Sequence, residues 1–192
     1  MMQTLIAFLL LAIWPLFSAA QERILSLKAE KLTRVLDELQ KTPDDPQVQE
    51  AYLRAFPGDY KSFLELFDFR RELYDGHDFI VVLPWLAKDH EAQVGKLLVQ
   101  LSKDAHYEAD APSSLQDATA EYGSQHTKAF GELLKLLPPD KQDQLITFLA
   151  DIESHSSYKE YQVIVDHLRA LGDGALADKF ERARRKRRLR SD

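Results

Sequence analysis

The chain has no cysteine among its 192 residues. This absence excludes disulfide bonds, thiol nucleophiles, cysteine-based zinc sites and iron–sulfur clusters. Stability must therefore come from side-chain packing. A chain of this length can provide it, because it is long enough to bury a hydrophobic core.

Glycine is also scarce, and the seven glycines are scattered along the chain. The sequence contains no glycine-rich phosphate loop, no Gly-x-Ser-x-Gly turn, no His-Glu-x-x-His pair and no calcium-loop pattern. No local motif thus predicts an enzyme, and we expect no cofactor and no metal site. An enzyme with catalytic residues gathered from distant helices stays an alternative, since such a site leaves no local pattern.

Long apolar runs are absent after the first twenty residues. The one extended run, Leu5–Phe17, is followed by the small residues Ser18, Ala19 and Ala20. It is shorter than the roughly 20 residues that cross a bilayer, and no basic residue precedes it. We predict a cleaved signal peptide over residues 1–20 and therefore export, to the periplasm or the medium. An uncleaved anchor and a buried helix are the alternatives.

The remaining sequence has the pattern of many short helices. Apolar residues recur at spacings of three, four and seven, as on one face of an amphipathic helix, and clusters of Pro, Gly and Asp separate the segments. The breaks share no fixed period, which favours an irregular bundle over a solenoid-like repeat array. We predict an all-α fold of about eight to ten short helices in one domain, residues 21–181. The expected helices are 22–40, 46–56, 60–69, a segment from 79, 91–103, 113–122, 126–137, 139–152, 157–171 and 175–188.

Three local details are expected. Asp45 precedes Pro46 in the arrangement of a helix cap followed by a first-turn proline. The run Phe79–Leu83 has β-branched residues, but we predict a helix because a lone strand would have no partner; Pro84 is expected to bend this helix or lie near its start. Ser113 and Gln116 have the spacing of a capping box.

Two polar segments are candidate recognition loops. Neither has the ligand spacing of a known metal site. We interpret them as partner-binding residues, because recognition side chains concentrate on loops held by a rigid scaffold. The residues are Asp75, His77 and Asp78 in an expected turn at 74–78, and His106, Glu108 and Asp110 in an expected break at 106–112.

The C-terminal segment 182–192 is strongly basic, although the whole chain carries a net charge of −6. A terminal block of like charge is typically solvated and disordered. It can also lie against the protein's own acidic surface, or hold the protein to an anionic membrane or polyanion. The basic residues are Arg182, Arg184, Arg185, Lys186, Arg187, Arg188 and Arg190.

These features together predict an exported, non-enzymatic protein that binds another protein, because an acidic surface suits the capture of a basic partner. An immunity-type inhibitor of a toxin that acts on the cell envelope is one form of this function. A protein held to the envelope by its basic tail is the alternative from another class. No nucleic-acid partner is expected.

Overall fold

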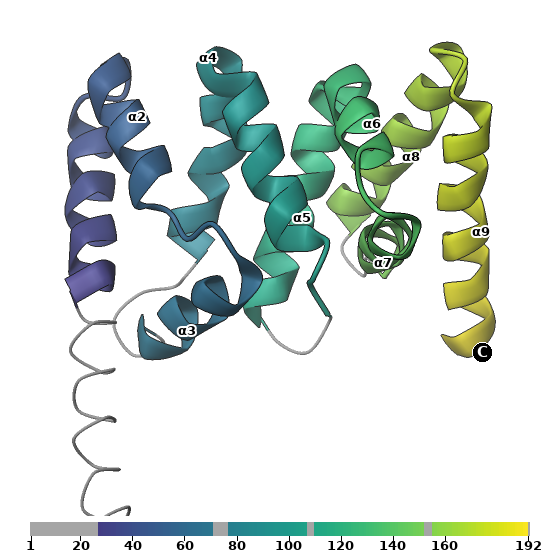
Figure 1. The fold of residues 1–192 in the computed structure, drawn as a ribbon, viewed down its shortest axis with the longest axis horizontal. Coiled ribbons are helices and arrows are strands. Elements are labelled where there is room, and N and C mark those ends of the chain that lie inside the picture. The colour runs from purple at the N-terminus through teal and green to yellow at the C-terminus, as the bar shows by residue number, and fades with distance from the viewer. Residues whose placement is uncertain (1–26, 71–76, 107–109, 152–154, 192) are drawn as a thin grey trace, which may run out of the picture. The chain divides into compact units, whose positions relative to one another are not determined.

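The computed structural model describes residues 27–70, 77–106, 110–151 and 155–191 (Figure 1). Side-chain contacts given below come from residues 27–66, 78–106, 112–151 and 158–187. Every regular element in the described ranges is an α-helix, which confirms the predicted all-α class. The helices are residues 27–41, α2 (Pro46–Ala55), α3 (Tyr60–Arg70), α4 (His77–Ser102), α5 (Asp110–Gln125), α6 (Thr127–Lys135), α7 (Pro139–Ala150), α8 (His155–Ala170) and α9 (Gly174–Ser191).

The predicted signal peptide lies outside the described residues. Among the helices that the structure describes, none combines the length and the apolar composition needed to cross a membrane.

The chain divides into two compact units. Of the described residues, the first unit contains 27–56 and 65–70, and the second contains 57–64, 77–106, 110–151 and 155–191. Helix α3 thus contributes its beginning to the second unit and its end to the first.

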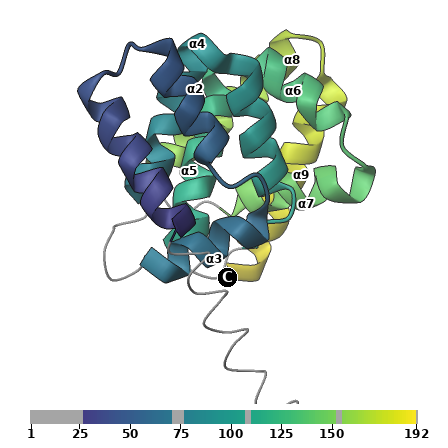
Figure 2. The ribbon, with the colours of Figure 1, turned by 60° about the vertical axis from the view of Figure 1, so that its left-hand side comes forward.

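In the first unit, the helix at 27–41 lies beside α2 (Figures 1 and 2). The predicted cap is confirmed: the carboxylate of Asp45 accepts the backbone N–H of Gln47 at 2.8 Å, and Pro46 opens α2. The side-chain amide of buried Gln49 donates to the carbonyl of Pro43 at 2.8 Å, which ties α2 to the preceding turn. Proline can occupy the first turn because that position needs no backbone donor.

The second unit is built around α5. Helix α5 packs against α4, α6, α7 and α8, and α9 packs against α7 and α8. The apolar core of the second unit contains large side chains from every helix from α4 to α9. They recur at the helical spacing that the sequence shows. Fully buried examples are Leu83, Leu98, Leu115, Tyr122, Phe130, Leu145, Leu149, Tyr161, Ile164 and Phe180.

The segment Phe79–Leu83 is helical, as predicted, and belongs to α4. The bend in α4 does not occur at Pro84, which lies inside the helix, but at His90, whose φ of −128° and ψ of 37° are not helical. A proline removes one backbone hydrogen bond. Here the helix continues beyond it because Leu86 and Ala87 are buried immediately after it. The interruption falls in the polar stretch between the two apolar halves of α4.

Both expected loops are shorter than predicted. His77 and Asp78 are not in a turn but are the first residues of α4, and Asp110 is the first residue of α5. Carboxylates are favoured at these positions because helix N-termini carry partial positive charge. The predicted capping box is also wrong: Ser113 lies inside α5 and not at its start, and the buried side-chain amide of Gln116 donates to the carbonyl of Phe148 in α7.

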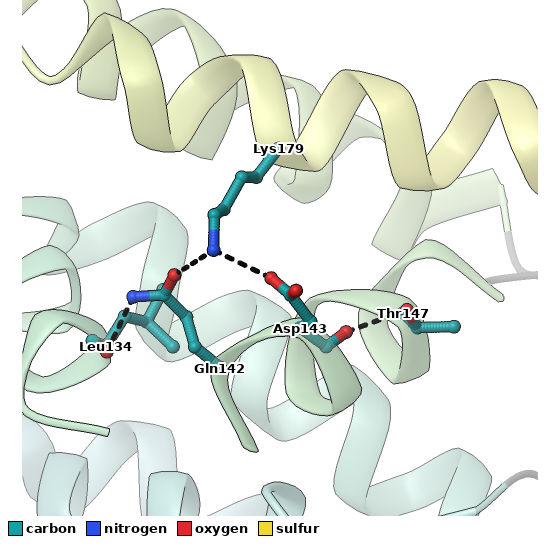
Figure 3. A network of polar contacts seen from close by, with 5 residues as sticks. All are labelled: Leu134, Gln142, Asp143, Thr147 and Lys179. Carbon is teal, nitrogen blue, oxygen red and sulfur yellow. Dashed lines mark hydrogen bonds and ion pairs between the residues drawn. The ribbon is translucent and has the colours of Figure 1, made fainter. Parts of the chain in front are cut away.

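Helix α9 is fixed to the unit by polar contacts along its length. Lys179 donates to Gln142 at 2.6 Å and to the carboxylate of Asp143 at 2.7 Å, both on α7 (Figure 3). Gln142 in turn donates to the carbonyl of Leu134, near the end of α6, at 2.9 Å. The hydroxyl of buried Tyr161 donates to the carbonyl of Phe180 at 2.6 Å.

The basic segment is a continuation of α9 and not a disordered tail over its described residues 182–191. Arg184 donates to the carbonyl of Ala150 at 2.8 Å and lies over the ring of Tyr158, 5.1 Å from its centroid. Arg187 forms an ion pair with Asp151. Two of the seven basic residues therefore stabilise the fold itself.

We predict that Gly95→Ala destabilises the protein. A Cβ at Gly95 would overlap the ring and hydroxyl of Tyr122 and would lie 2.9 Å from Leu133 Cδ1. Overpacking of a buried site costs about 1–3 kcal/mol and outweighs the roughly 1 kcal/mol that alanine gains in a helix. Urea denaturation should show a lower midpoint. Gly174→Ala is the matched control, because nothing lies within 4 Å of its Cβ position; an equal loss in both variants would contradict the close approach of α4 and α5.

Candidate functional site

An open depression of about 460 Å³ lies where α4, α5 and the start of α6 meet. Its lining residues come from three segments that are separate in sequence: Pro84, Trp85 and Lys88 from α4, Glu121 and Gln125 from α5, and His126 before α6. Trp85 is 45% exposed, which is unusual for the largest apolar side chain. The depression therefore presents an aromatic surface beside charged and polar groups.

Helical spacing positions these side chains. Val81, Trp85 and Lys88 are four and three residues apart and share one face of α4. Val81 is 46% exposed and extends the apolar surface by one turn beyond Trp85. On α5, the amide of Gln125 donates to the carboxylate of Glu121 at 3.2 Å. This bond between residues four apart fixes two polar groups on the same side of the depression.

Buried Tyr122 supports the depression from below. Its ring stacks on His126 with centroids 5.0 Å apart and an angle of 22° between the planes. Its hydroxyl donates to the carbonyl of Glu91 at 3.2 Å. Burial, and then the Glu91 carboxylate, raise the pKa of the Tyr122 phenol to about 12, so it stays a neutral donor. Glu91 also lies 3.5 Å from Nδ1 of His126, an ion pair when the imidazole is protonated.

Two further carboxylates lie near Glu121, which lines the depression. Asp117 and Glu121 lie one turn apart on α5, and Glu160 of α8 faces their negative charge. Partial burial, followed by repulsion from Glu121 and from Asp117, raises the pKa of Glu160 from 4.5 to about 7. Near neutral pH this carboxyl is therefore about half protonated, and a bound cation would favour its ionised form.

This arrangement suits the binding of a cation. An ammonium or guanidinium group over an indole ring gains from the ring's electron density, and a neighbouring carboxylate adds a charged hydrogen bond. Among the described residues, no group of three histidine or carboxylate side chains could hold a metal ion.

The residues predicted as recognition loops are only partly described. Asp78 and His106 are exposed, and their side chains share no hydrogen bond or ion pair with each other. The backbone carbonyl of His106 accepts the hydroxyl of Tyr60 at 3.1 Å. Asp75 and Glu108 lie outside the described residues, as do the side chains of His77 and Asp110. Their role in partner binding stays a prediction.

The residues that form the depression were not singled out from the sequence. Trp85 follows the apolar run that predicted a core helix, and Glu121 and Gln125 resemble ordinary solvated positions. One signal was available: Val81 and Trp85 are apolar four residues apart, on a different face of the helix from Phe79 and Leu83. Two apolar stripes on one helix indicate that one of them is exposed.

Comparison of the chain with protein families, with curated proteins and with solved structures finds no match. The assignment of a function therefore depends on the geometry of the chain itself.

Stability should fall as the pH rises through the Glu160 transition. The folded state holds the proton up to about pH 7, whereas the unfolded chain releases it near pH 4.5. The folded state thus binds more protons between these values, and the free energy of unfolding decreases with pH across this window. We predict that Glu160→Gln stabilises the protein at pH 8 by about 1 kcal/mol, or 2–4 °C, after allowance for solvent screening.

Thermal denaturation between pH 4 and 9 measures this effect. The gain should disappear below pH 4.5, where Glu160 is protonated in both states. Glu132→Gln is the control, since Glu132 is an exposed carboxylate on α6 outside the cluster. A gain in stability that does not vary with pH, or an equal gain in the control, would show that Glu160 does not cause the pH dependence of stability.

Proposed function

We propose that this is a non-enzymatic binding protein that captures a basic segment of another protein in the depression beside Trp85. The observation that carries the proposal is the half-exposed indole of Trp85 on the rim of an open depression that also contains the Glu121 carboxylate. Tryptophan dominates the binding energy of many protein interfaces, because it offers a large rigid surface with little loss of side-chain freedom.

The electrostatic surroundings support a positively charged partner. Glu121 lines the depression, and Glu91 lies 3.5 Å from His126 of the same lining, against a single lining lysine, Lys88. Asp117 and Glu160 are close enough to Glu121 to repel one another and add negative charge on that side. A lysine or arginine of the partner would lie over the indole and meet Glu121 at its charged end. The overall charge of −6 would add attraction at longer range and speed association at low salt.

Inhibition of a toxin is one form of this function. In that case the basic segment would belong to the toxin, and binding would cover its active site. A strain that has neither the toxin nor this protein should then grow normally. Loss of viability in that strain would contradict inhibition of a toxin. Capture of a different basic partner is tested separately by the binding experiment below.

Substitution of Trp85 should strongly weaken partner capture. We expect the wild-type protein to retain one stoichiometric protein from an extract of its own cells at low salt and to release it at high salt. Trp85→Ala should weaken the affinity for the purified partner at least about thirtyfold, as for a central interface residue. Glu121→Gln should weaken it about tenfold and flatten its salt dependence. Calorimetric titration gives both values.

Leu136→Ala is the matched control, because Leu136 is a large apolar side chain of the same unit that is 81% exposed and lies outside the depression. It should bind the partner as the wild type does. Capture that survives in Trp85→Ala, or that is lost equally in Leu136→Ala, would overturn the proposed site.

A further inference from the structure

The charged side chains of α9 divide into two groups. Most charged side chains in the described part of α9 have partners within the second unit. Arg169 binds both carboxylates of the helix, at 3.3 Å from Asp178 and 2.8 Å from Glu181. Lys179 pairs with Asp143 and Arg187 with Asp151, while Arg184 donates to the carbonyl of Ala150. The carboxylates of Asp143, Asp151, Asp178 and Glu181 are thus already engaged.

Three basic residues are left over. Arg182, Arg185 and Lys186 are exposed, and their side chains form no hydrogen bond or ion pair within the described part of the chain. An α-helix turns by about 100° per residue, so these positions fall within roughly 100° of one another on the helix circumference. Arg184 and Arg187 fall on the opposite side, where they contact the rest of the unit. We call the three exposed residues the α9 cationic face.

The cationic face is held rigidly. The Tyr161–Phe180 hydrogen bond, the Lys179 contacts in Figure 3 and the Arg187–Asp151 ion pair attach α9 to α7 and α8 on both sides of residue 182. A flexible tail would lose conformational entropy when its charges met a surface. This helix has already lost that entropy in folding, so the three charges approach a surface together.

We propose that the α9 cationic face binds the protein to the surface of an anionic phospholipid bilayer. A row of cations on one side of a straight helix can reach a planar surface simultaneously. Each basic residue near such a surface strengthens binding about fivefold. The alternative of a single-stranded nucleic acid is less well matched, because no aromatic residue for base stacking occurs in 181–191. This surface is separate from the depression at Trp85, and neither proposal depends on the other.

Co-sedimentation with lipid vesicles tests the proposal. The protein is purified with the N-terminus that it has in the cell, which mass spectrometry identifies, so that any apolar N-terminal segment is the same in every sample. Vesicles of phosphatidylcholine with 30% phosphatidylglycerol are compared with pure phosphatidylcholine. We expect binding to the anionic vesicles only, decreasing as salt rises. The triple variant Arg182→Gln, Arg185→Gln, Lys186→Gln should bind about a hundredfold more weakly.

The matched control removes three positive charges elsewhere in the same unit: Lys96→Gln, Lys128→Gln and Lys159→Gln, all exposed and outside α9. It should bind anionic vesicles within a few fold of the wild type. An equal loss in both triple variants would assign the binding to net charge and overturn the proposal. Equal binding to both kinds of vesicle would overturn it as well, as would retention by heparin without retention by anionic vesicles. Unchanged thermal denaturation establishes that the variants are folded.

Discussion

The second unit depends on the close packing of Tyr122 against α4. Because residue 95 is glycine, the backbone of α4 can approach the Tyr122 ring, which is completely buried and meets Phe130 edge-on. The same ring stacks on His126, and its hydroxyl binds the carbonyl of Glu91 just after the bend in α4. One tyrosine thus joins three helices and positions two residues beside the depression. A side chain that is chiefly structural therefore positions the residues of the proposed binding surface.

Charge in this protein has two separate uses. At helix contacts, ionic and polar pairs such as Lys179 with Asp143 join helices of a chain that has no cysteine to form covalent links. Such pairs contribute little individually when exposed, but they fix which faces of the helices meet. The carboxylates around Glu160 and the cations at Arg182, Arg185 and Lys186 are concentrations of a single sign, and the two proposed binding surfaces coincide with them.

Local chemistry made much of the fold predictable. Asp45 with Pro46, Pro138 with Pro139 and the Gly172 turn each determine a helix boundary through backbone restrictions that act within a few residues. Features that depend on distant partners were not predictable. The buried amide of Gln116 bonded to Phe148 and the ordered position of Arg184 both arise from contacts between helices. The depression belongs to this second class, since its residues come from α4, α5 and the start of α6.

The position of α9 after the two helices that it covers has a consequence for synthesis. This helix contains buried Phe180, whose carbonyl accepts the Tyr161 hydroxyl. It also contains the two arginines that bind at the end of α7, Arg184 and Arg187. While a ribosome still holds α9, helices α7 and α8 expose the apolar surface that it covers. The second unit can therefore complete its core only after α9 has left the ribosome, and until then the nascent chain exposes apolar surface to aggregation.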